Sequence, residues 1–403
     1  MRLWPKIIIF GGILILLGTD IFFVYKISAT RSVGKKSEES SAYSTDTLLT
    51  SSLESCRSKA DSCYVKELEK VTTSYGPKAS LALLKSFQKQ GVVSAKQDDH
   101  QLAHSIGRFT AKKFGITGES FLRCDTSFNY GCQHGFFEYA LGVVGSAKDT
   151  AEKICGSFQG TYSSKFIFYC YHGVGHGILM AKAYDVPSAL ETCDSLRTSA
   201  GKEGCWQGVF MENANAGMRG EARSGQFSKE NPLLPCSQVA DIYKYQCFIN
   251  HAGWLVTVFP YDMAAASAAC LDAPSEYINA CMQSLGLMVS NPSWQYSLTT
   301  NTEGIALEAI AWKLCLQFPE KYRDQCVIGA VDNLLNFHEL DLSSPKTFCN
   351  KISSVYTLIC YNQIGSSLRS QVLKDDKIRE ACFSMKEDKI NTQSCFNGAG
   401  LQS

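Results

Sequence analysis

The sequence lacks an excess of charge of either sign. Basic and acidic residues number 39 and 38, the formal net charge is +1, and only 19% of the residues are charged, whereas 45% are hydrophobic. No cluster of lysine and arginine stands out, so the electrostatic footprint of a nucleic-acid-binding protein is missing. The composition is that of a folded chain that has no nucleic acid as a partner.

Common catalytic motifs are missing as well. The sequence contains no Gly-x-Ser-x-Gly elbow, no Gly-x-x-x-x-Gly-Lys loop, no His-Glu-x-x-His and no Cys-x-x-Cys-His. Their absence argues against serine-hydrolase, nucleotide-dependent, zincin and c-type haem chemistry. Cys-x-x-Cys does not occur either, and no two cysteines are closer than seven residues, which argues against a cysteine-based metal site.

An apolar run near the amino end predicts a membrane anchor. After a short flank of residues 1–6, residues 7–25 are mostly apolar, and a run of this length can span a bilayer as a helix. The alternative is a secretory signal that is cleaved at a weak site near residues 27–29. We expect an uncleaved signal anchor, followed by a flexible stalk rich in serine and threonine at residues 26–47.

The cysteines indicate on which side of the membrane the rest of the chain lies. Basic residues flank the apolar run on both sides, so the charge distribution does not orient the span. Eighteen cysteines, an even number, would stay reduced in the cytosol but can pair outside it. We therefore expect residues 48–403 to be extracytoplasmic, at a cell surface, in a periplasm or in a lumen, and secreted if the apolar run is cleaved.

The cysteines fall in consecutive pairs. Within a pair the separation is 7 to 15 residues, and the gap to the next pair is 22 or 23 residues in five of eight cases. The resulting repeat of roughly 31 to 45 residues is typical of solenoids built from helical hairpins. The sequence leaves the connectivity open, but stapled hairpins predict sequential bonds: Cys56–Cys63, Cys124–Cys132, Cys155–Cys170, Cys193–Cys205, Cys236–Cys247, Cys270–Cys281, Cys315–Cys326, Cys349–Cys360 and Cys382–Cys395.

Each cysteine pair lies between two helix-like segments. The first cysteine ends a segment such as 309–315, the second begins one such as 326–335, and turn-prone residues such as 318–321 separate them. The long gap between the first two pairs has room for one more hairpin without cysteines, with helices at 78–90 and 98–114. The predicted fold is an all-α solenoid, right- or left-handed, of about ten hairpins.

Most of the histidines lie in one part of this helical-repeat domain. The chain has seven, and five of them fall within residues 98–182. Three neighbouring hairpins each contribute two residues spaced by four: His100 and His104, His134 and Glu138, and His172 and His176. Residues at this spacing share a helix face and can bind one metal ion. Because equivalent helices of a solenoid stack side by side, the three pairs can converge on one wall.

The position of these residues within the repeat supports the convergence. Slot one, two residues after the second cysteine of a pair, holds His134 and His172. Slot two, six residues after that cysteine, holds Glu138 and His176. Later hairpins place mostly other residue types at both slots. A glycine follows each slot-one histidine, which suits close helix packing or room for a ligand.

These residues favour a metalloprotein. The six predicted ligands suit one ion or, better, two, and a divalent transition metal such as zinc or iron fits them best: His100, His104, His134, Glu138, His172 and His176. Arg108 shares a helix face with His104 and is a candidate contact for an anionic substrate, and a solvated or ion-paired arginine is the favoured alternative. A catalytic metal here would activate water or dioxygen, which predicts a hydrolase or an oxygenase.

Other functions fit the same residues. The histidines can be hydrogen-bonded structural groups, or they can bind a polar ligand without a metal. A scaffold without catalytic activity could bind a protein, peptide or glycan at the cell surface, and an exposed stripe of aromatic residues along the array would favour it. Metal capture for uptake or storage is a further alternative. The sequence leaves the oligomeric state open.

Overall fold

A computed structural model describes the helical body of the chain, at residues 55–57, 59–89, 99–223, 225–260, 262–291, 307–337, 341–371, 374–385 and 388–402. These residues form nineteen α-helices and two short 3-10 helices, and no strand occurs among them, as predicted for an all-α chain. The expected anchor at 7–25 and stalk at 26–47 lie outside the described residues. None of the described helices is long and apolar enough to cross a bilayer.

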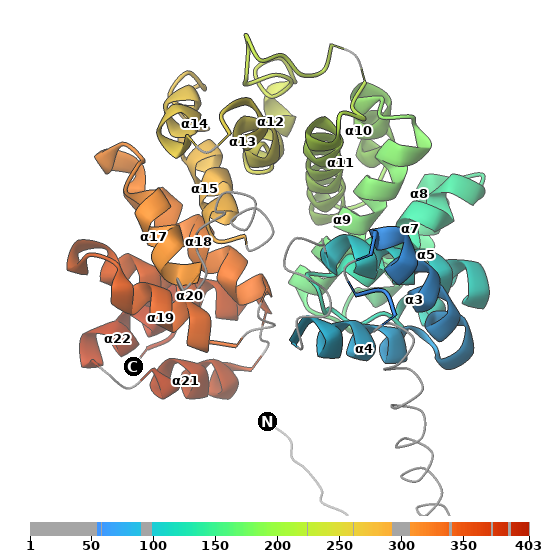
Figure 1. Ribbon diagram of the computed structural model, residues 1–403, viewed down its shortest axis with the longest axis horizontal. Helices are drawn as coiled ribbons and strands as arrows, with labels where there is room; N and C mark the ends of the chain where they lie inside the picture. Colours follow the sequence, from blue (N-terminus) through green and yellow to red (C-terminus); the bar gives the residue numbers. More distant parts are fainter. Residues whose placement is uncertain are drawn as a thin grey trace, which may run out of the picture. The chain divides into compact units, whose positions relative to one another are not determined.

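From α6 onward, most hairpins combine a short first helix with a longer second helix (Figure 1). The amino-terminal helices are α3 (Asp61–Tyr75), α4 (Pro77–Lys89), α5 (Asp99–Phe114), α6 (Gly118–Phe121), α7 (Gly131–Val143), α8 (Ala147–Ile154), α9 (Ser164–Ala181), α10 (Val186–Asp194) and α11 (Ser199–Arg219). The others are α12 (Asp241–Phe248), α13 (Ala252–Val258), α14 (Met263–Cys270), α15 (Ile278–Val289), α17 (Leu307–Cys315), α18 (Arg323–Phe337), α19 (Ser343–Lys351), α20 (Ser354–Gln371), α21 (Asp375–Ser384) and α22 (Lys389–Gly398).

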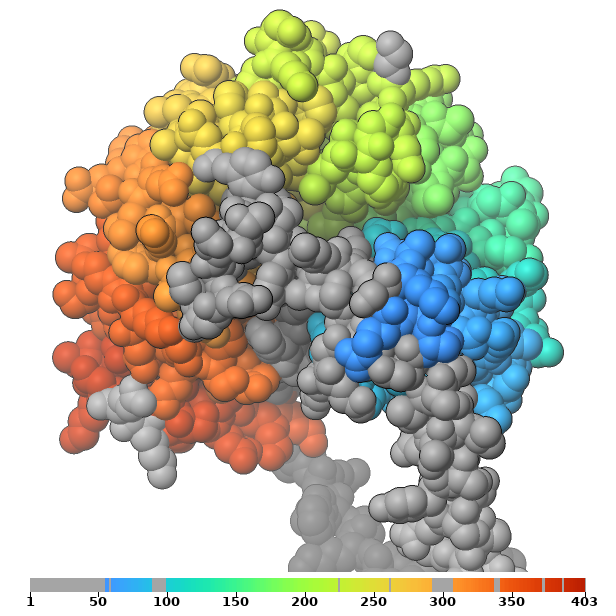
Figure 2. Space-filling model, in the orientation of Figure 1, coloured from blue at the N-terminus to red at the C-terminus, as the bar shows by residue number. Residues whose placement is uncertain are grey.

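The second helices of successive hairpins pack side by side in one row. α5 packs against α7, α7 against α9 and α9 against α11, and the row continues through α13, α15, α18 and α20 to α22. The short helices α8, α10, α14, α17, α19 and α21 each pack against the second helix of their own hairpin. In the space-filling view, successive parts of the chain therefore occupy adjacent blocks of the surface (Figure 2).

Side-chain caps begin several of the short helices. The Ser146 hydroxyl accepts a hydrogen bond from the Asp149 N–H at the start of α8. The Asp185 and Asp262 carboxylates cap α10 and α14 in the same way. Each cap satisfies a backbone N–H that the helix leaves unpaired. Local polar residues thus set where the first helix of a hairpin begins.

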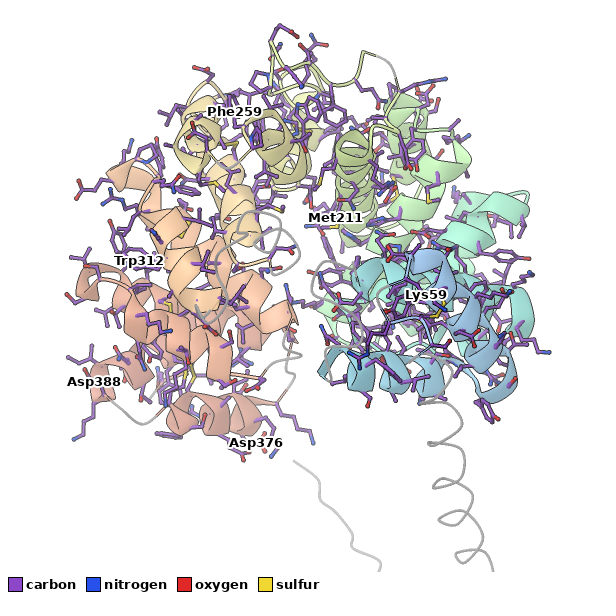
Figure 3. The ribbon with its side chains drawn as sticks, viewed as in Figure 1. Lys59, Met211, Phe259, Trp312, Asp376 and Asp388 are labelled. Atoms are coloured by element: carbon purple, nitrogen blue, oxygen red, sulfur yellow. A yellow bond between two sulfur atoms is a disulfide. The ribbon has the colours of Figure 1, made fainter. Side chains whose placement is uncertain are left out.

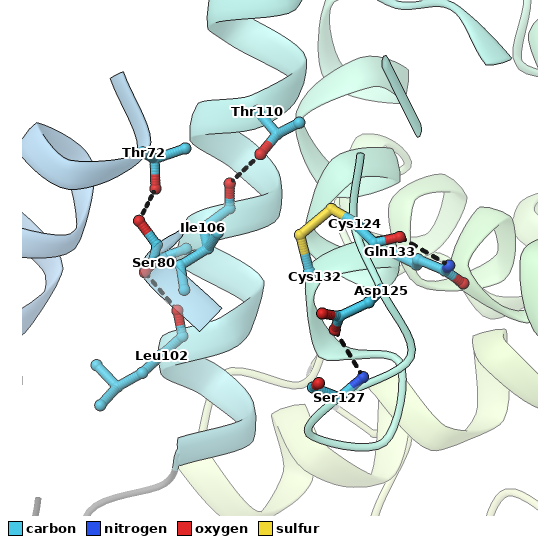
Figure 4. Close-up of a disulfide and its surroundings, with 11 residues drawn as sticks. Thr72, Ser80, Leu102, Ile106, Thr110, Cys124, Asp125, Ser127, Cys132 and Gln133 are labelled. Carbon is cyan, nitrogen blue, oxygen red and sulfur yellow. Dashed lines mark hydrogen bonds between the residues drawn. A yellow bond between two sulfur atoms is a disulfide. The ribbon is translucent and has the colours of Figure 1, made fainter. Parts of the chain in front are cut away.

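All nine predicted disulfides are present, with the sequential pairing that the hairpins require. Figure 3 shows the sulfur atoms among the side chains. Figure 4 shows the bond between Cys124, which precedes α7, and Cys132, which lies in the first turn of α7. Another bond joins Cys193 in α10 to Cys205 in α11. Closing a loop of about 12 residues contributes on the order of 3 kcal/mol. Nine such bonds indicate an extracytoplasmic or secreted protein.

The hairpin that was predicted without cysteines is also present. Its two helices, α4 and α5, begin and end within one residue of the predicted ranges 78–90 and 98–114. Both helices pack against α3. The buried hydroxyls of Thr72 on α3 and Ser80 on α4 are hydrogen-bonded at 2.8 Å (Figure 4). A buried polar contact thus joins α3 to α4, the first helix of the hairpin that has no disulfide.

Glycines bring neighbouring second helices into backbone contact. A Cβ atom on Gly135 of α7 would lie 1.8 Å from the His104 carbonyl oxygen of α5, and one on Gly107 of α5 would lie 1.9 Å from a carbonyl oxygen of α7. Gly175 of α9 and Gly208 of α11 make the same reciprocal contact. The pairs α15 with α18 and α20 with α22 repeat it. Only a residue without a side chain permits this approach.

Candidate metal centre

Five of the predicted ligands come together between α5, α7 and α9. The ring centroid of His134 lies 5.5 Å from that of His100 and 5.4 Å from that of His104. It lies 4.9 Å from those of both His172 and His176. All of these rings are buried except His100, which is half-buried. The single histidine of α7 therefore stands between two histidine pairs, one on each neighbouring helix.

The backbone contacts explain why the rings meet. The carbonyl oxygens of His104 and His172 each face a glycine of the next helix, 1.8 and 1.9 Å from the place where its Cβ would be. His104 is thus the structural counterpart of a slot-one residue, although α5 contains no cysteine. Slot one runs through His104, His134 and His172, on the second helices of three consecutive hairpins. His100 lies one turn before this line, and His176 one turn after it.

In the first pair, His100 and His104 face each other through their Nε2 atoms, which are 2.9 Å apart. The Nδ1 atom of His100 is 2.7 Å from the Phe128 carbonyl oxygen, and that of His104 is 2.5 Å from Glu138 Oε1. Neither oxygen has a hydrogen to donate, so each Nδ1 is the donor. In the neutral rings each Nε2 then carries a lone pair, and the two lone pairs face each other.

The second pair repeats this arrangement. The Nε2 atoms of His172 and His176 are 3.0 Å apart. The Nδ1 atom of His172 is 2.9 Å from Gln207 Oε1, and that of His176 is 3.1 Å from Glu212 Oε2. Each of the four rings thus donates from Nδ1 to an oxygen behind it and directs Nε2 toward its partner. Hydrogen bonds of this kind orient the histidines of metal sites.

Two buried carboxylates support the pairs from behind. Glu138 also accepts a hydrogen bond from Arg108 Nη1 at 2.5 Å, and Glu212 accepts one from Arg219 Nη2 at 2.7 Å. Burial alone would raise the pKa of each glutamate. The interactions with its histidine, and then with its arginine, hold each pKa below the ordinary range. Both carboxylates are therefore ionised at neutral pH, which strengthens them as acceptors for Nδ1–H.

Two predicted site residues have partners that the sequence does not reveal. Glu138, predicted as a ligand, directs its two oxygens to His104 and Arg108. Arg108, predicted to contact a substrate, forms this ion pair, and 38% of its side chain is exposed. Glu138 and Arg108 thus both help to hold the His104 imidazole in place.

His134 differs from the four rings around it. Both of its nitrogens are buried, and neither has a hydrogen-bond partner in the part of the chain that the structure describes. Burial, and then the charges of the surrounding histidines with His176 first, lowers the pKa of His134 well below its ordinary value. The ring is therefore neutral at pH 7. Leaving its buried polar atoms without a partner costs free energy.

The spacing of the nitrogens suits metal ions. Two groups of three ligand atoms lie within 4.8 Å of one another, and one ring belongs to both: His100, His104 and His134, and His134, His172 and His176. Two nitrogens bound to one ion at about 2.0–2.1 Å lie about 3.3–3.4 Å apart at a tetrahedral angle and about 2.8–3.0 Å apart at a right angle. The Nε2 separations of 2.9 and 3.0 Å correspond to an angle of about 90° at the ion. A third such group combines Glu138, His176 and Glu212, but both of its carboxylates are already paired with arginines.

The sequence does not predict two groups of the centre, and it offers a third, Glu212, only as a possible reserve carboxylate. Glu212 lies seven residues after Cys205, one residue past slot two. Gln207 occupies slot one but does not have a typical ligand side chain. The Phe128 carbonyl belongs to three consecutive residues with positive φ, 54°, 52° and 64°, which no periodic pattern signals.

His251 lies outside this centre. It stands at the break between α12 and α13, where its Nε2 donates a hydrogen bond of 2.7 Å to the Pro232 carbonyl oxygen. Burial lowers the pKa of His251 to about 4. A neutral, hydrogen-bonded ring at a helix break is a structural residue. His338 lies outside the described residues.

The described tryptophans do not form an exposed stripe. Trp254 is buried, and Trp206 and Trp312 are partly buried and pack against the apolar core. The feature that would favour a binding scaffold is therefore not seen at these three positions.

No protein-family model, no curated protein and no solved structure matches this chain. The function is therefore argued from the chemistry of the histidine centre.

Proposed function

We propose that this chain is an extracytoplasmic metalloprotein in which five imidazoles bind a transition metal. The observation that carries the proposal is the approach of two Nε2 atoms to 2.9 Å in one histidine pair and to 3.0 Å in the other. Both atoms of each pair carry lone pairs when the rings are neutral, and two acceptors at this distance repel each other unless a cation lies between them. A metal ion bound by both nitrogens is such a cation.

A shared proton is the alternative cation. It would make one ring of each pair an imidazolium and place two positive charges in a buried cluster of five imidazoles. The ionised carboxylates behind His104 and His176 stabilise positive charge, so they favour a bound cation of either kind. They also make the opposite Nε2 atoms better donors to a metal. We propose a metal ion rather than a proton, because each pair forms a group of three potential ligand atoms with His134, and a shared proton joins only two.

The donor set narrows the choice of metal. All cysteines are in disulfides, so no thiolate is available. Neutral imidazoles suit zinc, iron and copper. We assign one role to the five histidines, that of ligand: His100, His104, His134, His172 and His176. Glu138 and Glu212 are positioning residues, because each orients one of these imidazoles through its Nδ1–H.

The enclosure of the centre favours chemistry on a small molecule. Four of the five imidazoles are buried, and His100 alone is partly exposed. A hydrolase that acts on a peptide or glycan needs a metal position open to a large substrate. A small molecule such as dioxygen can reach a buried site through local fluctuations. We therefore propose oxidoreductase chemistry ahead of hydrolysis.

We also propose that the helical body is an α-solenoid and that residues 7–25 tether it to a membrane. The row of second helices and the recurring disulfide support the solenoid. The length of the apolar run supports the tether. Extraction of membranes with alkaline carbonate tests it: a tethered chain stays in the membrane fraction, and release of the chain would contradict the tether.

Elemental analysis tests the metal function. The full chain is purified under oxidising conditions, incubated with zinc, iron or copper, freed of excess metal and analysed for bound metal. We expect at least one ion per chain in the wild type and loss of most of it in the double variant His104→Ala, His172→Ala. His251→Gln, whose amide can replace the Nε2 donor, is the matched control and should retain the metal. A folded, fully disulfide-bonded wild type without bound metal would rule out the proposal.

A further inference from the structure

We infer that the centre holds two metal ions and that His134 bridges them through its two ring nitrogens. The inference rests on the proposed metal function and deepens it, because it assigns the number of ions and the group that joins them. Each ion would have three histidine nitrogens, two from one pair and one from His134. The bridge would be an imidazolate, the ring with no proton on either nitrogen.

The first argument is the state of the ring nitrogens. Each of the other four imidazoles directs Nδ1 to an oxygen, which leaves it one nitrogen for a metal. A histidine that binds a single metal normally donates its second N–H to such an oxygen. His134 has no hydrogen-bond partner of this kind among the described residues, and both of its nitrogens are buried. Two bound ions would satisfy both nitrogens.

The second argument is the position of the ring. His134 lies on α7, between the pair on α5 and the pair on α9, and it belongs to both groups of three potential ligands. Its centroid is 4.9 to 5.5 Å from those of all four neighbouring rings. The two nitrogens of an imidazole point away from each other, so one ring can serve an ion on each side.

The third argument is the duplication of the supporting groups. The pair on α5 has its own carboxylate and arginine, Glu138 and Arg108, and the pair on α9 has Glu212 and Arg219. A single ion would need one such set. Two complete sets, one for each histidine pair, support two ion positions.

The protons balance in this scheme. Neutral His134 carries one N–H and one lone pair. The first ion binds the lone pair of one nitrogen. The second ion binds the other nitrogen and displaces its proton, which passes to water. No oxidant or reductant is needed. The shared ring then couples the two ions electronically, which suits chemistry in which both take part.

Copper(II) is the probe, because two copper(II) ions joined by an imidazolate couple antiferromagnetically, whereas isolated ions give a full electron paramagnetic resonance signal. The full-length protein is loaded with copper(II), the copper content per chain is measured, and the signal intensity at low temperature is compared with that content. We expect two copper ions per chain and loss of most of the signal.

His134→Ala removes the bridge and leaves a cavity beside both pairs. We expect the full signal per copper ion in this variant and renewed loss of signal when free imidazole is added to fill the cavity. Circular dichroism and disulfide mapping report whether the variant folds. His172→Ala provides an independent test because it removes a ligand of one group only: copper should fall to one ion per chain, with an uncoupled signal. His251→Gln, the matched control, should keep two coupled ions.

The possible failures are distinguishable. One copper ion per chain in the wild type, or two ions with an intact signal, overturns the bridge and leaves the metal function standing. A coupled signal that persists in His134→Ala without added imidazole also overturns the bridge. No bound copper overturns the bridge, and the absence of bound zinc and iron as well overturns the metal function.

Discussion

Single hydrogen bonds behind the imidazoles decide what the histidines can do. The acceptors for Nδ1 are a backbone carbonyl, an amide oxygen and two carboxylates. Because each acceptor holds the proton on Nδ1, the lone pair of Nε2 can act as a ligand. The spacing of the histidines in the sequence identifies the rings. It does not identify the acceptors, because those lie on other helices or in an irregular turn.

Glu138→Gln tests the importance of this support. The substitution keeps the shape of the side chain but removes the charge that faces His104 and Arg108. We expect metal affinity to fall about 10- to 100-fold, as is typical when an outer hydrogen-bond partner is lost. Competition with a chelator measures the affinity. Glu119→Gln, on α6 with a side chain 85% exposed, is the control and should bind like the wild type. Equal affinity in Glu138→Gln and wild type would contradict the positioning role.

The approach of whole helices brings the rings within reach of each other. Packed helices usually lie 8–10 Å apart, at a distance set by the side chains between them. The reciprocal glycine contacts of α5 with α7, and the approach of Gly177 on α9 to the Phe137 carbonyl of α7, bring backbone atoms against each other. Slot one of α5, α7 and α9 therefore forms one line of histidines. The glycines are visible in the sequence, but the atoms that they contact are not.

Gly135→Ala tests this close approach. Its new Cβ would lie 1.8 Å from the His104 carbonyl oxygen, so α5 and α7 must move apart. We expect a loss of about 3 kcal/mol in the free energy of unfolding, at the upper end of the usual cost of overpacking, and weaker metal binding. Gly142→Ala, on the same helix with nothing within 4 Å of its Cβ, is the control. Its helix propensity should stabilise the protein by about 0.5–1 kcal/mol. Chemical denaturation measures the free energy of unfolding of both variants. Equal stabilities would contradict the close packing of α5 and α7.

The helical body as a whole combines contacts between neighbouring hairpins with one set of distant contacts. Most helices contact their own hairpin and the next one, but α9 also contacts α20. Lys165 Nζ of α9 lies 3.4 Å from Asn336 Oδ1 of α18, across 171 residues of sequence. Burial lowers the pKa of Lys165 to about 8, although Asp332 opposes this shift. Hairpins that are far apart in the chain therefore also depend on one another.

Opening single disulfides tests how far the hairpins are independent. Cys382→Ser with Cys395→Ser opens a loop of 13 residues, and Cys155→Ser with Cys170→Ser opens one of 15. Each pair of substitutions should cost about 3 kcal/mol. Only the second should also reduce metal content, because Cys170 lies two residues before His172. Thermal unfolding and elemental analysis measure the two effects. Equal metal loss in both variants would contradict the localisation of the centre.

The sequence by itself determined the repeating frame and the identity of the imidazoles. Cysteine pairs at a regular spacing predicted the hairpins, all nine disulfides and an extracytoplasmic body. The hairpin formed by α4 and α5 was predicted within one residue at each end. The slot positions predicted that His134 and His172 would lie near each other. These features could be predicted because periodicity along the chain determines which helix face a residue occupies.

Only the tertiary structure decided how these residues interact. It paired Glu212 with His176, Arg108 with Glu138 and the Phe128 carbonyl with His100. It also placed His134 between the two pairs, with no hydrogen-bond partner for either nitrogen among the residues that the structure describes. These contacts depend on the helix crossings that the glycines permit, and on a turn of three residues with positive φ. Such contacts join residues at irregular separations along the chain, so no repeat spacing could have predicted them.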